Sequence, residues 1–190
     1  MPKSRIFIIS GPTGCGESTI TKAIIEKIPN FTRLVTATSR PLRLNEKNGV
    51  DYFFFSKEKF ENEIKKGNIL EHGYISNRDT YYGTYGPYLK EKLKEGFNII
   101  GNLEHKGTIF FKENYDAVTI FIKPDSMDNL KKRLLRREPD ISQDELQKRL
   151  RNAEDEIKNE EKYYEYTVIN AEGKLEEAIE EVKDIIEKNI

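Results

Sequence analysis

The chain has 190 residues, of which 36% are hydrophobic and 34% charged, a composition typical of one soluble domain with a modest core. Its 32 basic and 33 acidic residues give a formal net charge of −1, so we expect neither nucleic acid nor an anionic membrane as the main partner. Because Cys15 is the only cysteine, no internal disulfide can form, and we expect a reducing, cytoplasmic setting. The apolar run before Gly11 is too short for a signal peptide or a membrane span.

The first elements follow the order that opens many phosphate-binding folds. Residues 5–10 form a nearly continuous apolar run, which predicts a strand buried on both faces of a parallel sheet. A glycine-rich turn from Gly11 to Gly16 comes next, and residues 18–28 indicate a helix that Pro29 ends. A strand, a glycine-rich turn and a helix in this order predict an α/β domain.

Residues 36 to about 88 interrupt this alternation. Short strands are predicted at residues 50–56 and 69–75, and a helix at residues 57–66 is terminated by Gly67. We interpret this segment as a small mixed α/β insertion on the parallel core.

Three later apolar runs continue the core. Residues 97–100, 117–122 and 166–170 predict buried strands, and a charged amphipathic helix is expected from about Lys174. Helical patterns lie between and after these runs, which argues for a parallel sheet with helices on both faces.

Residues 126–163 are long, charged and helical in pattern. Ser126 is a candidate N-cap, Pro139 predicts a break, and the capping box Ser142-Gln-Asp-Glu145 restarts the helix. Because a helix–break–helix so rich in Arg and Lys packs poorly into a core, we expect a mobile lid.

These elements predict a single α/β domain over residues 1–190. The parallel core is expected at about 1–35, 96–125 and 164–190, the insertion at about 36–90 and the helical lid at about 137–155.

The glycine-rich turn matches most of the phosphate-binding pattern Gly-x-x-x-x-Gly-Lys-Ser/Thr. Gly11 and Gly16 have the required spacing, and Ser18 stands where a hydroxyl would ligand Mg²⁺, but Glu17 occupies the lysine position. Two unit charges about 4 Å apart interact by roughly 4 kcal/mol at an effective dielectric of 20, so this reversal opposes ATP binding or turnover. A glycine-rich strand–helix turn that binds no ligand is the alternative interpretation.

Several segments, in order and spacing, make the chain resemble the guanylate kinase family over essentially its whole length. They are Ser10-Gly-Pro-Thr-Gly-Cys-Gly-Glu-Ser-Thr19, Thr36-Ala-Thr-Ser-Arg-Pro-Leu-Arg43, Asn48-Gly-Val-Asp-Tyr-Phe-Phe54, Ile69-Leu-Glu-His72, Tyr81-Tyr-Gly-Thr84, residues 130–137, Lys148-Arg-Leu150 and Val168-Ile-Asn170.

The resemblance implies a GMP site in the insertion. Arg40 and Arg43 would bind the GMP phosphate together with the hydroxyls of Tyr52 and Tyr82, since arginine forks match phosphate oxygens. Guanine offers donors on N1 and N2 that one carboxylate can accept, and Glu71 matches that role. The remaining base contacts are expected from Thr36, Thr84 and Glu104.

The resemblance also implies an ATP–Mg²⁺ site. Where the family carries Leu-Asp-x-Asp, this chain has Gly101-Asn-Leu-Glu104, so Asn102 lacks a charge that would help hold the metal. Metal contacts are expected from Ser18 and Asn102, and catalytic roles fall to Arg137, Arg149 and the position of Glu17. The expected ATP and phosphate contacts are Gly11, Gly14, Gly16, Ser18, Thr19, Arg133 and Asn170.

The function that follows is transfer of the γ-phosphoryl group of ATP to GMP with Mg²⁺, giving ADP and GDP, weakened by Glu17. An alternative is a catalytically inactive guanylate-kinase-like module that binds GMP or phosphorylated peptide. A related P-loop kinase for another phosphorylated small molecule is a third hypothesis. We expect a monomer or homodimer, and whether Lys3, Lys22 or a lid arginine replaces the missing lysine stays open.

Overall fold

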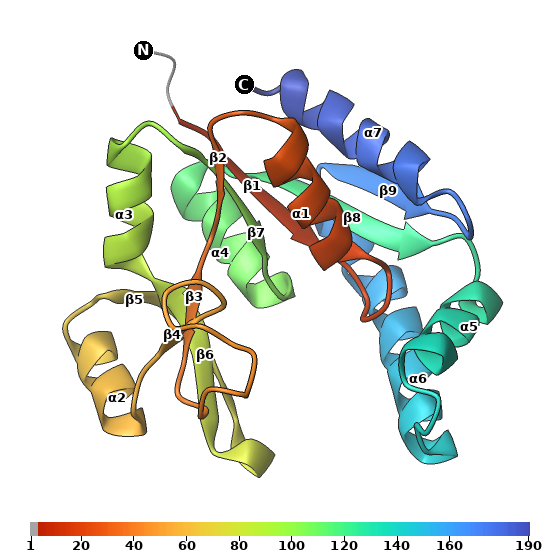
Figure 1. Ribbon diagram of the computed structural model, residues 1–190, viewed down its shortest axis with the longest axis horizontal. Helices are drawn as coiled ribbons and strands as arrows, with labels where there is room; N and C mark the ends of the chain where they lie inside the picture. Colours follow the sequence, from red (N-terminus) through yellow and green to blue (C-terminus); the bar gives the residue numbers. More distant parts are fainter. Residues whose placement is uncertain (1–3) are drawn as a thin grey trace.

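The computed structural model describes residues 4–190 and confirms the predicted α/β class, with a parallel sheet at its centre (Figure 1). The strand order is β2-β7-β1-β8-β9, and all neighbouring strands run parallel. The strands are β1 (Ile6–Ser10), β2 (Phe31–Arg33), β7 (Asn98–Asn102), β8 (Val118–Pro124) and β9 (Tyr166–Asn170).

Helices cover both faces of this sheet because the central strand is apolar on both sides. Phe7 and Ile9 pack into the larger core cluster with α1 and α7, whereas Ile6 and Ile8 pack with α3 and α4 on the other face. Each fully buried side chain of this kind stabilises the fold by about 1.5–3 kcal/mol. The helices are α1 (Glu17–Lys27), α3 (Gly86–Lys94), α4 (His105–Tyr115) and α7 (Leu175–Glu187).

A second, mixed sheet extends from the edge at which the parallel strands end (Figure 1). Its order is β4-β3-β6-β5, with β3 and β4 parallel and the other pairs antiparallel. A small core of Ala37, Phe55, Phe60 and Ile69 lies beneath it. Its elements are β3 (Thr36–Thr38), β4 (Phe53–Phe54), α2 (Lys57–Lys65), β5 (Ile69–Ile75), η1 (Ser76–Arg78) and β6 (Thr80–Tyr85).

The prediction of a strand at residues 50–56 was wrong for most of its length. Only Phe53–Phe54 pairs as a strand, because Gly49, with φ 78°, turns the chain just before it. The side chain of Asn48 accepts a hydrogen bond from the Phe54 backbone N–H, so side-chain bonding within the turn replaces ladder bonds. The predicted strand at Ile69–Ile75 is confirmed.

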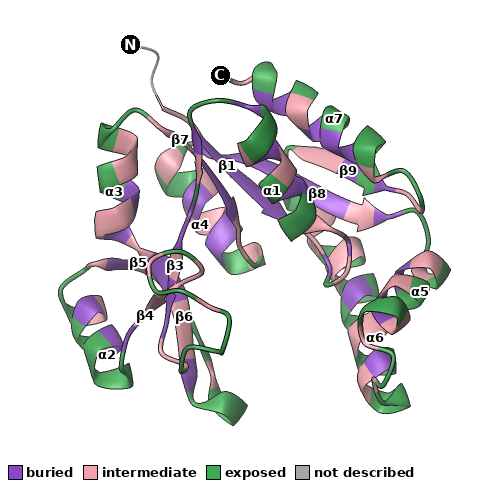
Figure 2. Cartoon of the chain, in the orientation of Figure 1, coloured by how far each residue is buried: buried purple, intermediate pink, exposed green. Residues whose placement is uncertain are grey.

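The charged stretch after β8 folds into the helical hairpin α5 (Met127–Arg137) and α6 (Gln143–Asn159), followed by η2 (Glu161–Tyr163). Both predicted caps are confirmed: Ser126 accepts from the backbone N–H of Asn129, and Ser142 accepts from that of Glu145. The hairpin is buried along one stripe and largely exposed elsewhere (Figure 2). Within residues 4–190, none of the helices has the length and apolar character needed to cross a membrane.

Candidate functional site

The phosphate loop joins the end of β1 to α1 and has the shape that its glycines predict. Gly16 adopts φ 96° and caps α1, which begins at Glu17, so the first-turn backbone N–H groups of Ser18 and Thr19 face the loop. A Cβ on Gly16 would lie 2.6 Å from Asn170 Nδ2, which leaves no room for a larger residue. Gly11, Gly14 and Gly16 lie in this loop, and Ser18 and Thr19 follow in the first turn of α1 with exposed side chains.

Asn170 holds this loop in place through a side-chain hydrogen bond. It lies at the end of β9, is 4% exposed, and donates from Nδ2 to the Cys15 carbonyl oxygen at 2.8 Å. Its own carbonyl accepts from Arg133 Nη2 at 2.8 Å, and Arg133 Nε also pairs with Glu172 at 3.0 Å. Both side chains predicted at the ATP site therefore lie next to the loop, but their polar groups bond to protein atoms.

A cavity beside the loop, here called the loop cavity, has a volume of about 620 Å³. Four carboxylates line it, from Glu17, Glu104, Glu156 and Glu160. Its full lining is Ser10, Gly11, Thr13, Glu17, Asn102, Leu103, Glu104, His105, Lys106, Glu156 and Glu160. The side chain at the lysine position therefore faces a space that is already acidic.

This environment changes the chemistry of two carboxyl groups. Burial, with a smaller contribution from the Glu156 charge, raises the pKa of Glu17 to about 8, and Arg137 partly offsets that rise. Burial, followed by the charges of Glu160 and Glu104, raises the pKa of Glu156 to about 7. Carboxylates that repel one another and are poorly solvated do not attract a polyphosphate.

The two arginines with predicted catalytic roles belong to the α5–α6 hairpin, and neither lines the loop cavity. Arg149 donates from Nη1 to Glu138 and from Nε to Glu145, each at 2.9 Å. Arg137 lies 3.7 Å from Glu138 and is largely exposed. Reaching a phosphate would require both arginines to change partners.

Asn102, predicted beside the metal, ends β7 next to the loop. Its Nδ2 donates to Thr21 Oγ1 at 2.9 Å and to the Ile9 carbonyl at 3.3 Å. Its Oδ1 is buried and accepts no hydrogen bond from the described residues. The residues from 4 to 190 hold no cluster of three or more His, Cys, Asp or Glu suited to a metal ion. The unpartnered Oδ1 of Asn102 and the exposed hydroxyl of Ser18 are oxygen ligands of the kind that Mg²⁺ prefers when it arrives with a nucleotide and keeps most of its water.

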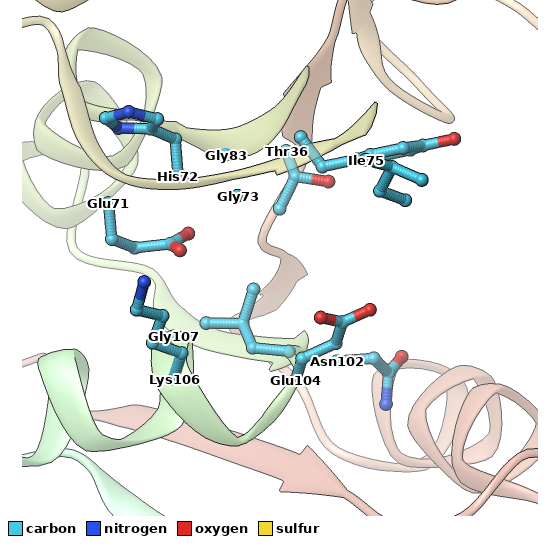
Figure 3. A pocket seen from close by; sticks show the side chains of 12 residues that line it. Thr36, Glu71, His72, Gly73, Ile75, Gly83, Asn102, Glu104, Lys106 and Gly107 are labelled. Atoms are coloured by element: carbon cyan, nitrogen blue, oxygen red, sulfur yellow. The ribbon is translucent and has the colours of Figure 1, made fainter. Parts of the chain in front are cut away.

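A second cavity, here called the sheet cavity, opens between the mixed sheet and the start of α4 (Figure 3). Its volume is about 180 Å³. Thr36, Glu71, Tyr82 and Glu104 among the predicted residues line it. Figure 3 shows the carboxylates of Glu71 and Glu104 facing its interior from opposite walls. The full lining is Thr36, Glu71, His72, Gly73, Ile75, Tyr82, Gly83, Asn102, Leu103, Glu104, Lys106 and Gly107.

The position of Glu71 results from a β-bulge. Between the pairs Ile69–Tyr85 and His72–Gly83, two residues of β5 oppose the single residue Thr84 of β6. Thr84 Oγ1 donates to Glu71 Oε1 at 2.7 Å, and a Cβ on Gly83 would lie 2.4 Å from the Glu71 carbonyl oxygen. Burial raises the pKa of Glu71, and the Thr84 hydrogen bond opposes that rise.

The register of β3 against β6 gathers the other predicted side chains. Thr36 pairs with Thr84, and Thr38 pairs with Tyr82, so Thr84 and Tyr82 project from the same face of β6. The Tyr52 ring meets the Tyr82 ring edge-on at 6.0 Å between centroids. The predicted residues from three separate segments therefore converge here.

The two predicted phosphate-binding arginines follow β3, and a glutamate that was not predicted organises them. Arg40 donates from Nη1 and Nη2 to the two oxygens of Glu46 at 2.6 and 2.5 Å. The Arg43 backbone N–H donates to Glu46 at 2.9 Å, while its side chain is exposed. The Arg40 guanidinium also lies 5.1 Å from the Tyr52 ring centroid. Glu46 raises the pKa of Arg40, and Arg40 lowers the pKa of Glu46 to about 2.

Sequence reasoning missed Glu46, Lys106 and Glu156. A carboxylate three residues after Arg43 is a usable signal for the first, because it is within reach of both arginines. Lys106 and Glu156 gave no such signal, since only the fold brings them to a cavity. Of the proposed substitutes for the missing lysine, Lys22 faces Glu26 at 3.9 Å on the exposed side of α1, and Lys3 lies outside the described residues.

Comparison with known proteins agrees with this geometry. A family model described as Guanylate kinase matches residues 3–189. A guanylate kinase of Oceanobacillus iheyensis is 38% identical over 186 residues, which cover 97% of this chain and 87% of that protein. One of Streptococcus mutans is 40% identical over 188 residues, covering 97% and 86%. The crystal structure of guanylate kinase from Anaplasma phagocytophilum gives a TM-score of 0.75 at 27% identity and covers 100% of this chain and 87% of that one.

A phosphate loop between a buried parallel strand and a helix, with a mixed sheet and a helical hairpin beside it, defines a P-loop kinase. The match to the family model and the sequence identity to relatives over nearly the whole chain define the family more narrowly than the fold does. The chain belongs to the guanylate kinase family, whose members are nucleoside monophosphate kinases.

Proposed function

We propose that this chain transfers the γ-phosphoryl group of ATP to GMP, and that Glu17 weakens the reaction. The sheet cavity is the observation that carries this proposal. Its buried Glu71 carboxylate, oriented by Thr84, can accept from both N1 and N2 of guanine, whereas adenine offers no such pair of donors. The relatives named guanylate kinase over most of the chain support the same substrate.

In this proposal the mixed sheet is the GMP-binding subdomain. The GMP phosphate lies against Arg40, Arg43, Tyr52 and Tyr82, where Glu46 already fixes the Arg40 fork. The α5–α6 hairpin serves as the lid, and its closure brings Arg137 and Arg149 from their glutamate partners toward the phosphates.

The chemistry needs alignment more than covalent help. A GMP phosphate oxygen attacks the γ-phosphorus of ATP, the bond from that phosphorus to the β–γ bridging oxygen breaks, and ADP leaves with the electron pair. The loop N–H groups hold the donor phosphates. Ser18 and Asn102 are the residues that would hold Mg²⁺, and the ion would supply neutralisation of phosphate charge.

A coupled assay of ADP and GDP formation from ATP, Mg²⁺ and GMP tests the proposal directly. We expect slow turnover by the unmodified chain and a large gain for Glu17→Lys. GMP should raise the melting temperature while AMP does not. Equal stabilisation by GMP and AMP would contradict the role of Glu71 in recognising guanine. Absence of turnover by both the unmodified chain and Glu17→Lys would contradict the kinase proposal.

A second candidate function is a module that binds GMP or a phosphorylated peptide without catalysis. The lining of the loop cavity favours it, because the four carboxyl groups and the single lysine that residues 4–190 contribute offer little attraction for ATP there. Retained GMP binding together with no turnover, even after Glu17→Lys, would select this function. A cytoplasmic setting and a monomer or homodimer stay predictions.

A further inference from the structure

The segment from β7 to the start of α4 is a shared wall between the two cavities. Asn102, Leu103, Glu104 and Lys106 line both the loop cavity and the sheet cavity. In the proposed reaction the transferring phosphoryl group crosses between the donor in one cavity and the acceptor in the other. Side chains on this wall therefore lie beside its path.

Charge makes one residue of the wall stand out. Among residues 4–190, Lys106 is the one lysine or arginine that lines the loop cavity, against the four carboxylates described above. Of the arginines nearby, Arg133 pairs with Glu172 and Arg149 with Glu138 and Glu145. Arg137 is largely exposed, lies 3.7 Å from Glu138 and does not line the cavity. A polyphosphate that enters this space meets a single ammonium group on its lining.

Lys106 is also free to move. It is the second residue of α4, it is exposed, and it forms no ion pair within 4.0 Å in the described part of the chain. Figure 3 shows its ammonium directed toward the Glu71 carboxylate, whose pKa it lowers. A guanine that donates to Glu71 would occupy its acceptor oxygens without cancelling its charge, and the flexible four-carbon stem of Lys106 lets the ammonium turn toward phosphate.

We propose that Lys106 supplies the positive charge that faces the donor phosphates, in place of a lysine at position 17. This assignment rests on the proposed kinase function, and it adds a phosphate-binding residue on the shared wall. An ammonium group works here as a point charge and does not require the fixed geometry of the phosphate loop.

A double-mutant cycle on the full chain tests this assignment. The dissociation constants of AMP-PNP with Mg²⁺ and of GMP are measured by calorimetry for Lys106→Met and Lys106→Arg, with the exposed Lys90→Met as the control. We expect Lys106→Met to weaken AMP-PNP binding about tenfold or more, and Lys106→Arg and Lys90→Met by less than about threefold. GMP binding should change less than AMP-PNP binding for Lys106→Met, and by less than about threefold for Lys106→Arg and Lys90→Met.

The same substitution is then made together with Glu17→Lys. If Lys106 replaces the missing lysine, restoring that lysine makes the loss from Lys106→Met fall below about threefold. A merely structural role would produce the same loss in both backgrounds, and circular dichroism confirms that each variant is folded.

Three results would overturn the assignment: unchanged AMP-PNP binding, a loss confined to GMP, or equal losses in both backgrounds. Absence of AMP-PNP binding by the unmodified chain would overturn it as well. Turnover by Glu17→Lys reports on the kinase function separately, so the two proposals fail in distinguishable ways.

Discussion

The sheet cavity and the loop cavity differ in how well shape and charge agree. In the sheet cavity, strand register, a bulge and a threonine hydroxyl all orient Glu71 for the same ligand. In the loop cavity, the backbone has the shape of an anion site, while Glu17, Glu104, Glu156 and Glu160 line it with carboxyl groups that do not attract phosphate.

The phosphate loop therefore adopts its shape without a lysine at position 17. Gly16 sets the turn and Asn170 holds the Cys15 carbonyl, and neither residue lines the loop cavity. Position 17 is then free to vary without loss of the fold. Shape alone is a poor guide to whether such a loop binds ATP.

The largest expected effect comes from placing a positive charge at position 17. Glu17→Lys puts an ammonium group at the donor phosphates where a carboxyl group with a pKa of about 8 now stands, so we expect turnover to rise about 100-fold or more. The measurement is kcat in the ATP–GMP assay. Glu17→Gln is the matched control, because it resembles the protonated carboxyl group and adds no cation, and it should give little gain near pH 7.

The next largest effect is expected in the sheet cavity, from removal of the carboxylate that is proposed to accept from guanine. Glu71→Gln replaces one acceptor oxygen by a donor, and we expect GMP binding to weaken about 30-fold. Calorimetry with GMP measures this loss, and the exposed Glu58→Gln is the control. A loss of less than about twofold would mean that guanine is recognised elsewhere.

A smaller effect is expected at Glu46, which binds Arg40 and the backbone of Arg43 at once. Glu46→Ala frees the Arg40 fork to sample other rotamers, so GMP affinity should fall about fivefold, with kcat changed less than KM. Guanosine, which lacks the phosphate, should bind equally to both proteins. Tighter GMP binding by the variant would instead show that Glu46 competes with the phosphate.

The smallest expected effect is a pH dependence of stability at Glu156. Its folded-state pKa is about 7, above the value of about 4.3 for an unfolded glutamate, so the folded chain holds the proton more tightly. The contribution of Glu156 to the free energy of unfolding should therefore fall as pH rises from about 4.3 to 7 and stay level above that, while Glu17, with a pKa of about 8, adds a slope of its own.

Glu156→Gln removes the slope due to Glu156. We expect a gain of about 1 kcal/mol at pH 8, discounted for solvent at the cavity mouth, and little change at pH 4.5. Urea unfolding at the two pH values measures it. Equal gains at both would mean that packing, and not ionisation, causes the change.

The parallel core was predictable from sequence because its signals are local. Apolar runs marked β1, β8 and β9, and the serine caps of α5 and α6 depend on residues within one helical turn. The strand expected at residues 50–56 failed because a turn at Gly49 competed with strand propensity.

Only those residues of the candidate site that belong to family motifs could be predicted from the sequence. Glu71, Thr36 and Tyr82 do converge, yet the hydrogen bond of Asn170 to the loop depends on a contact between residues 155 positions apart. Lys106 gave no signal because a lysine near a helix start is ordinary on a protein surface. Its significance comes from the two cavities on either side of it.

The bulge at Glu71 has a consequence for how this protein tolerates mutation. Gly83 bears no side chain that could contact a ligand, yet a single added carbon would sit 2.4 Å from the Glu71 carbonyl oxygen. The backbone of Glu71 would have to shift to relieve that clash, and its carboxylate would move with it. Discrimination among nucleobases therefore depends on a position that has no side chain with which to recognise one.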